Sequence, residues 1–340
     1  MTLHLDLSYI IAGNRSRTAA AGIDPFHYER ATAGIGTARE WTAAFLRTGR
    51  ERLADAERAD SAISAGEAYR DAALWFHFAA ILPVPGVLGE AEAAADEAMG
   101  RALKLLEPSA ERVEGVGFAG WLRRPAGVAR PALVVVVPGM DSSKEEFTAV
   151  ADALLRRGLA TLAIDGPGQG VLAATTAPDA DYGRVVGRAL DAVGDRPDLD
   201  ASGVGVIGLS LGGFYAALTA AREPRVRAAV TVSGPYRLSW AELPPFVTET
   251  LTLRAGDAAA ARAFADRVDL TDLAPEIAAP LLVVDGDTDV IPGVVNGAPL
   301  AAAAPQGEYL SVPGGDHLVG NVRAAWLPLA ADRLARALTA

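Results

Sequence analysis

Hydrophobic and polar positions follow two different periods along the chain. Up to about residue 110 the apolar residues recur at helical spacing, with charged residues on the opposite face. Proline, glycine and N-cap residues mark where these helices begin and end. The pattern predicts a helical N-terminal domain over residues 1–110, with its clearest helices opening at Thr37 and covering 61–82 and 89–106.

From residue 111 onward the pattern becomes that of strands and helices in alternation. Residues 113–122 alternate and are rich in glycine, as in an antiparallel hairpin, and Ala132–Val137 is apolar on both faces, as in an interior strand. The alternation predicts an α/β fold with a mostly parallel, doubly wound sheet over residues 111–340. It lapses at about 234–275, which we interpret as a lid inserted after a strand.

The stretch Val204–Gly213 joins an apolar run to the sequence Gly-Leu-Ser-Leu-Gly-Gly and then to an alanine-rich helical pattern. Strand, sharp turn and helix in this order form a nucleophile elbow, with Ser210 at its tip. The alternative is an ordinary glycine-rich turn. The same stretch satisfies Gly-x-Gly-x-x-Gly, but that motif lies inside the strand here, which argues against a dinucleotide site.

A nucleophilic serine needs a base, and the base needs an acid that fixes its tautomer. Of the four histidines only His317 follows Ser210, in a glycine-rich loop directly after a predicted strand. The acid is expected after the preceding strand, where Asp285, Asp287 and Asp289 stand. We favour Asp289, because Asp285 belongs to the strand end and Asp287 to the turn.

Acyl chemistry also requires donors for an oxyanion. The backbone N–H that follows the nucleophile belongs to Leu211, and for the second donor we nominate Met140, in the loop after an early strand. Ser142 and Ser143 lie in the same loop. We interpret them as N-caps of a helix that starts near Lys144.

These residues together resemble the α/β-hydrolase superfamily over about Glu111 to Ala340. With the helical segment in front, the chain is similar to the group that contains 2,6-dihydroxypseudooxynicotine hydrolase, the fermentation-respiration switch protein and fungal polyketide-shortening hydrolases. That group includes C–C bond hydrolases acting on aromatic ketones, with the helical segment covering the site. The resemblance implies Ser210, Asp289 and His317 as a catalytic triad and an assisting acid, for which Glu242 is the nearest candidate. Three turn motifs carry it: residues 138–145, 165–170 and 208–213.

Composition narrows the classes of partner. Hydrophobic residues make up 51% of the chain and charged residues 21%, as in a globular protein. A net charge of −11 offers no basic surface for nucleic acid or an anionic membrane, so a small-molecule substrate is expected. The absence of cysteine excludes thiolate chemistry and Cys-based metal sites; no metal and no cofactor are expected.

The apolar stretch 72–89 is too short and too interrupted to cross a membrane, and we interpret it as a buried helix and its exit turn. His77, within it, is interpreted as a buried helix residue or a pocket wall. Residues 1–20 show no signal peptide, so a cytoplasmic location is expected. Whether the chain forms a homodimer is left open.

The sequence thus predicts a serine hydrolase with a helical cap, acting on a bulky, carbonyl-containing small molecule. The bond cleaved is an ester or a carbon–carbon bond beside a ketone. One alternative is a lyase of natural-product biosynthesis that eliminates acetate from an acylated polyketide or tetronate intermediate. Another is a binding protein that has kept the fold without turnover.

Overall fold

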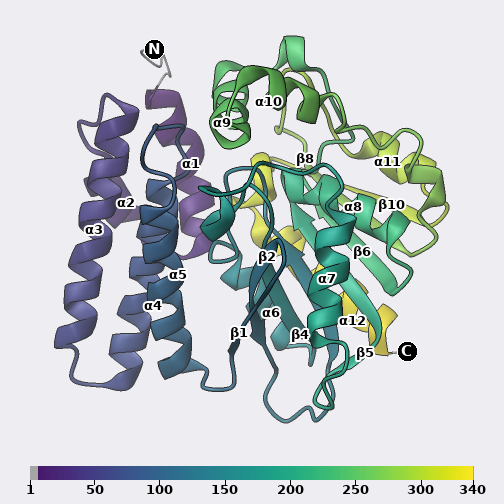
Figure 1. Ribbon diagram of the computed structural model, residues 1–340, viewed down its shortest axis with the longest axis horizontal. Helices are drawn as coiled ribbons and strands as arrows, with labels where there is room; N and C mark the ends of the chain where they lie inside the picture. The colour runs from purple at the N-terminus through teal and green to yellow at the C-terminus, as the bar shows by residue number, and fades with distance from the viewer. Residues whose placement is uncertain (1–6, 340) are drawn as a thin grey trace.

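Five helices precede the first strand and form the helical layer on the left of Figure 1. The computed structural model describes residues 7–339, so residues 1–6 and Ala340, with what the sequence suggests of them, lie outside it. The three long helices confirm the helical pattern, whereas two shorter ones before them were not predicted, because they bury few apolar side chains. The helices are α1 (Leu7–Ala21), α2 (Pro25–Thr32), α3 (Ala38–Arg58), α4 (Ala62–Ala79) and α5 (Glu90–Leu106).

Local signals fix where α3 and α4 begin. Thr37 and Glu40 form a capping box, in which Thr37 Oγ1 accepts the Glu40 N–H at 3.2 Å and Glu40 Oε2 accepts the Thr37 N–H at 3.0 Å. The Ser61 hydroxyl caps α4 in the same way at 3.0 Å. Behind these caps the helices bury aromatic rings, and Trp41 and Phe45 stack with their centroids 4.2 Å apart.

An eight-stranded sheet follows, in the order β1-β2-β4-β3-β5-β6-β8-β10. β1 and β2 form the expected antiparallel hairpin and β2 pairs antiparallel with β4, while all other pairs in this sheet are parallel. β3 is buried along its whole length, as predicted for an interior strand. The strands are β1 (Glu111–Gly115), β2 (Phe118–Arg123), β3 (Ala132–Val137), β4 (Ala160–Asp165), β5 (Asp200–Leu209), β6 (Val226–Val232), β8 (Leu281–Gly286) and β10 (Gly307–Val312); β7 (Arg237–Leu238) and β9 (Val294–Val295) form a separate pair.

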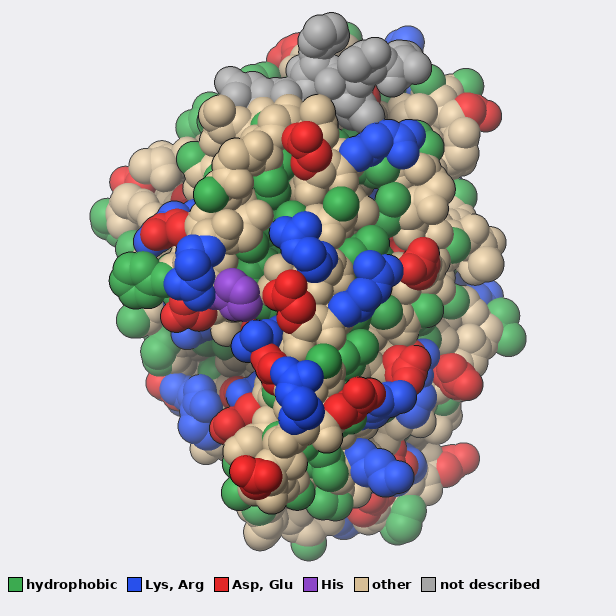
Figure 2. Space-filling model, turned by 90° about the vertical axis from the view of Figure 1, so that its left-hand side faces the viewer, with side chains coloured by type: hydrophobic (Ala, Val, Ile, Leu, Met, Phe, Trp, Pro, Cys, Tyr) green, Lys and Arg blue, Asp and Glu red, His purple; other side chains and the backbone are tan. Residues whose placement is uncertain are grey.

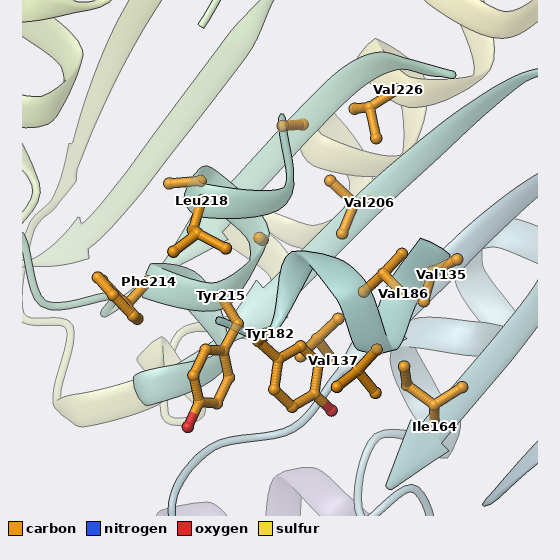
Figure 3. Packing of buried hydrophobic residues seen from close by; sticks show 14 of the residues in the cluster. Val135, Val137, Ile164, Tyr182, Val186, Val206, Phe214, Tyr215, Leu218 and Val226 are labelled. Atoms are coloured by element: carbon orange, nitrogen blue, oxygen red, sulfur yellow. The ribbon is translucent and has the colours of Figure 1, made fainter. Parts of the chain in front are cut away.

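Helices cover both faces of the sheet. The apolar side chains of α7, α8 and α11 share one buried cluster with the sheet, and those of α6 and α12 share a second on the other face. Figure 3 shows the first cluster, where Tyr182 and Tyr215 stack at 4.1 Å beside valines of the sheet. The helices are α6 (Thr148–Leu155), α7 (Gly183–Val193), α8 (Leu211–Arg222), α11 (Ala298–Ala303) and α12 (Leu327–Thr339), with 3₁₀ turns η1 (Gly170–Leu172), η2 (Trp240–Glu242), η3 (Ala274–Glu276), η4 (His317–Val319) and η5 (Arg323–Ala325).

The segment at 234–275 leaves the sheet after β6 and contains α9 (Pro245–Ala255) and α10 (Ala258–Ala265). Figure 1 shows both helices above the sheet, beside the helical layer. Phe246 of α9 packs against the aromatic cluster of the helical layer, and Leu251 belongs to the buried cluster of the sheet. This segment therefore joins the helical layer to the α/β part.

The outer side of the helical layer carries charges of both signs. Figure 2 shows Lys and Arg side chains interspersed with Asp and Glu over this face. Pairs such as Arg15–Glu29, at 2.7 Å and about half exposed, contribute roughly 0–1 kcal/mol each. Across residues 7–339, no helix combines the length and the apolar character that crossing a bilayer requires.

Candidate active site

Ser210 occupies a tight turn between β5 and α8, with a φ of 55°. A positive φ is uncommon for a residue with a β-carbon and persists only where the surroundings enforce it. Two glycines of the motif allow the turn. A β-carbon on Gly208 would lie 1.8 Å from the carbonyl oxygen of Gly212, and one on Gly212 would lie 2.2 Å from that of Val137. Only glycine fits at these two positions.

Ser210, His317 and Asp289 come together in one hydrogen-bonded chain. The His317 Nε2 lies 3.0 Å from Ser210 Oγ, and Nδ1 lies 3.0 and 2.9 Å from the two carboxylate oxygens of Asp289. The partners assign the tautomer: Nδ1–H donates to Asp289, and Nε2 accepts the serine O–H. This is the arrangement that a serine nucleophile requires.

The other two acids of the loop have different partners. Asp285 is the penultimate residue of β8, its Oδ2 accepts the Gly297 N–H at 2.8 Å, and burial raises its pKa to about 6. Asp287 is exposed and accepts the Gly314 N–H at 2.7 Å. Of the three candidates, Asp289 is the one that reaches His317.

The loop that carries His317 is held by residues far away in the sequence. Leu318 has a φ of 70°, and its N–H donates to the Ser233 hydroxyl at 3.0 Å. On the other side of the histidine, the Ser16 hydroxyl of α1 donates to the Asp316 carboxylate. Helix α1 therefore supports the loop of the candidate base.

The charges around His317 favour its protonated form. Burial lowers the pKa of the ring, but the hydrogen bond and negative charge of Asp289 outweigh burial, so the pKa of His317 lies above its ordinary value. Arg17 lowers this pKa and Asp141 raises it, each more weakly than Asp289. A base with a raised pKa takes a proton from serine more readily, provided that it starts neutral.

Two backbone N–H groups beside Ser210 have no partner within residues 7–339. One belongs to Leu211, the first residue of α8, and the other to Met140 in the loop after β3. The preceding residue, Gly139, packs against the nucleophile, since a β-carbon there would lie 3.3 Å from Ser210 Oγ. Both nominated donors thus belong to segments that touch Ser210.

The side chain of Gln169 braces the loop after β3. Its Nε2 donates to the carbonyls of Pro138 at 2.6 Å and Gly139 at 3.0 Å, while its Oε1 accepts from the Tyr182 hydroxyl at 2.7 Å. Gln169 is buried, and it lies in the 165–170 turn. That turn, one of the three motifs in the sequence, therefore positions the loop of Met140.

A buried ion cluster connects α1 to the same loop. The Arg17 guanidinium donates to Glu146 at 2.7 and 2.8 Å and to Asp141 at 2.9 and 3.1 Å. The carboxylate side chains are 2% and 8% exposed, respectively, and Arg17 supplies a positive charge to both. Burial alone would raise the pKa of Glu146, but the positive charge of Arg17 more than reverses this and holds it well below its ordinary value.

The interpretation of Ser142 and Ser143 as helix caps was wrong. Helix α6 begins at Thr148, and the Lys144 N–H donates to the buried carboxylate of Asp165 at 2.7 Å. Ser142 accepts from Arg17 at 3.0 Å, and the Ser143 hydroxyl lies 3.0 Å from His77 Nδ1. Both hydroxyls serve the contact between the helical layer and the loop.

His77 is buried in α4, as expected from its apolar neighbours, and its Nε2 lies 2.9 Å from Glu146. Glu242 is not brought to the site. It is an exposed residue of η2 and has no hydrogen bond or ion pair with Ser210, Asp289 or His317. The assisting role that the resemblance implied for Glu242 therefore has no support in the geometry.

Replacing Arg17 with methionine is expected to destabilise the fold by about 3–5 kcal/mol, since it leaves the buried carboxylate of Asp141 unpaired and that of Glu146 with His77 alone. The measurement is the free energy of unfolding from urea denaturation. Arg15→Met is the matched control on the same helix: Arg15 is 52% exposed in its pair with Glu29, and its loss should cost less than about 1 kcal/mol. Equal losses for the two variants would contradict this account of Arg17.

Sequence reasoning missed Arg17, Ser16 and Gln169. Arg17 and Ser16 belong to the helix that the hydrophobic pattern did not reveal, and their partners lie 129 and 300 residues away. One signal was present: the loop after β3 contains three acids, and acids buried beside a sheet must find cations. Within residues 7–339, no cluster of three or more His, Asp or Glu side chains is arranged to hold a metal.

The sheet order, the strained serine turn after the central strand β5 and the acid and histidine loops after β8 and β10 define an α/β-hydrolase fold. Comparison with known proteins agrees. Residues 134–337 match the Alpha/beta hydrolase family, and the chain belongs to that family.

Individual proteins are also similar to this chain, over different shares of its length. A 2,6-dihydropseudooxynicotine hydrolase of Paenarthrobacter nicotinovorans is 30% identical over 242 residues, covering 68% of this chain and 65% of that protein. The crystal structure of 2,6-dihydroxy-pseudo-oxynicotine hydrolase superposes with a TM-score of 0.84 at 26% identity, over 95% of each chain. A protein of Penicillium oxalicum named hydrolyase poxO is 36% identical over 136 residues, 36% of this chain and 31% of that one. The curated relatives are thus matched over less than two thirds of their length.

Proposed function

We propose that this protein is a serine-dependent hydrolase of a bulky, carbonyl-containing small molecule. The observation that carries the proposal is the chain of hydrogen bonds from Ser210 through His317 to Asp289, at 3.0 and 2.9 Å. The bond cleaved is an ester or a carbon–carbon bond next to a ketone. A relative named 2,6-dihydropseudooxynicotine hydrolase, similar over most of this chain, supports a ketone-bearing aromatic substrate.

In this mechanism Ser210 Oγ attacks the carbonyl carbon while its proton passes to His317 Nε2. Asp289 stabilises the imidazolium that forms, and the N–H groups of Leu211 and Met140 stabilise the oxyanion. Collapse of the intermediate breaks the bond to the leaving group, which takes the proton from His317. Water activated by His317 then releases the acyl group as an acid and restores Ser210.

The first test is covalent labelling with a fluorophosphonate probe, followed by intact mass. The wild type is expected to gain one adduct and Ser210→Ala none, because the probe reacts with an activated serine. Ser202→Ala, which removes an exposed hydroxyl bonded only to Asp200 within residues 7–339, should label like the wild type. An unlabelled wild type, or equal labelling of Ser210→Ala, would argue against the proposal.

A second candidate is a lyase that eliminates an acyl group such as acetate. One relative is named a hydrolyase, and this name supports the lyase as the second candidate. In elimination His317 would abstract a proton from carbon and no acyl-enzyme would form. Reaction in ¹⁸O-water separates the two: hydrolysis through acyl transfer places label in the acid released, and elimination leaves that acid unlabelled.

A further inference from the structure

Arg254 of α9 is a buried arginine that no carboxylate pairs with. Its exposed fraction is 4%, and its Nη1 and Nη2 donate to the carbonyls of Gly168 at 2.8 Å and Ala80 at 3.3 Å. A guanidinium has five N–H donors, so three of them are left over within residues 7–339. Arg17, whose side chain is 12% exposed, and the buried Arg123 differ, because each bonds two carboxylates.

The position of Arg254 is where three parts of the molecule meet. Ala80 caps the C-terminal end of α4 in the helical layer, and Arg254 itself lies in the segment between β6 and β8. Gly168 precedes Gln169, which braces the loop packed on Ser210. The guanidinium therefore lies at the junction of the helical layer, the α9 segment and the 165–170 turn, whose Gln169 braces the loop beside the nucleophile.

Its charge is incompletely compensated. Burial lowers the pKa of Arg254, and the strongest opposing attraction comes from Glu92, which does not reach ion-pair distance. Glu92 is itself buried, its Oε1 has no partner within residues 7–339, and burial raises its pKa, which favours the neutral acid. A buried cation without a counter-ion destabilises the protein, and an anionic ligand would relieve that cost.

We propose that Arg254 binds an oxyanionic substituent of the substrate, a carboxylate or an enolate, at a distance from the carbonyl that Ser210 attacks. As a statement about substrate it rests on the proposed hydrolase function. The planar guanidinium suits such a group, because two of its N–H donors match the two oxygens of a carboxylate or of a 1,3-dicarbonyl enolate. Arg254 then selects anionic over neutral substrates of the same shape.

The first experiment measures binding and does not require turnover. Thermal unfolding of Ser210→Ala is followed with 4-phenylbutyrate and with 4-phenylbutyramide, which differ in charge and little in shape. The carboxylate is expected to raise Tm and the amide to leave it unchanged. Adding Arg254→Gln should abolish the shift, and adding Arg254→Lys should keep part of it. Equal shifts, or no shift with the carboxylate, would overturn the proposal.

The second experiment compares mono-p-nitrophenyl glutarate with p-nitrophenyl pentanoate. The wild type should favour the carboxylate ester in kcat/KM, and Arg254→Gln should lose about 10–100-fold on that ester, mainly through KM, with the neutral ester nearly unchanged. Equal losses on both esters would show that Arg254 only supports the fold. A wild type that neither labels with fluorophosphonate nor cleaves either ester would refute the hydrolase proposal, whereas the Tm comparison would still test Arg254.

Discussion

Ser210→Ala is expected to lower kcat for p-nitrophenyl butyrate by about 10⁴- to 10⁶-fold. Serine hydrolases lose activity on this scale when the nucleophile is removed, because the remaining donors stabilise the transition state without a covalent route. The effect should appear in kcat with little change in KM, since the hydroxyl bonds the transition state rather than the bound substrate. Alanine also keeps the β-carbon, so the strained turn at φ 55° is preserved.

The control is Ser202→Ala. The Ser202 hydroxyl is exposed and lies near the start of β5, whereas Ser210 follows the end of that strand. This variant should keep wild-type rates. Unfolding by urea should give similar stability for both variants. A Ser210→Ala protein that retained more than about a hundredth of the wild-type rate would show that another group performs the attack.

Asp289→Asn is expected to lower kcat by about 10⁴-fold at pH 8. The Asn amide is nearly the same size, but it offers an N–H where His317 Nδ1–H needs an acceptor, and it removes the charge that stabilises the imidazolium. Asp287→Asn is the matched control, because Asp287 is exposed and an Asn oxygen can still accept the Gly314 N–H. Comparable losses in the two variants would contradict the assignment of Asp289.

The dependence of activity on pH provides a second test of the role of Asp289. His317 acts as a base only when neutral, so activity falls as the pH drops through its pKa. Because Asp289 raises that pKa, the acid limb of the wild type should lie above the ordinary histidine value of about 6.5. In Asp289→Asn the raising influence is gone and burial remains, so the limb should move to lower pH. A limb that stays in place would mean that another group titrates.

Much of the fold and part of the site could be predicted because their signals are local. The sequence around Ser210 predicts a strained turn, and the structure gives the reason, since a β-carbon on Gly208 or Gly212 would overlap backbone. The local pattern also predicts β3 and the β1–β2 hairpin. The choice among Asp285, Asp287 and Asp289 was harder. All three stand within five residues, and only the register of the loop against β10 decides which one faces His317.

What could not be predicted depends on contacts between distant segments. The sequence predicts the start of α6 near Lys144, whereas the helix begins at Thr148 and the Lys144 N–H donates to Asp165, a partner that no local pattern reveals. Arg17 and Arg254 look like ordinary helix arginines in the sequence. Their burial follows from how the helical layer and α9 pack on the sheet. Glu242 was proposed by resemblance alone, and its position in an exposed 3₁₀ turn follows from the path of the segment after β6.

The contact between α1 and the loop that carries His317 can form only late in protein synthesis. Ser16 and Asp316 are 300 residues apart, so a ribosome adding roughly 5–20 residues per second finishes α1 many seconds before the His317 loop exists. Until then α1 lacks the partner that Asp316 supplies, although the contacts of Arg17 with the loop after β3 can form earlier. Assembly of Ser210, Asp289 and His317 therefore waits for the loop that carries His317, and the contact between Ser16 and Asp316 forms at the same stage.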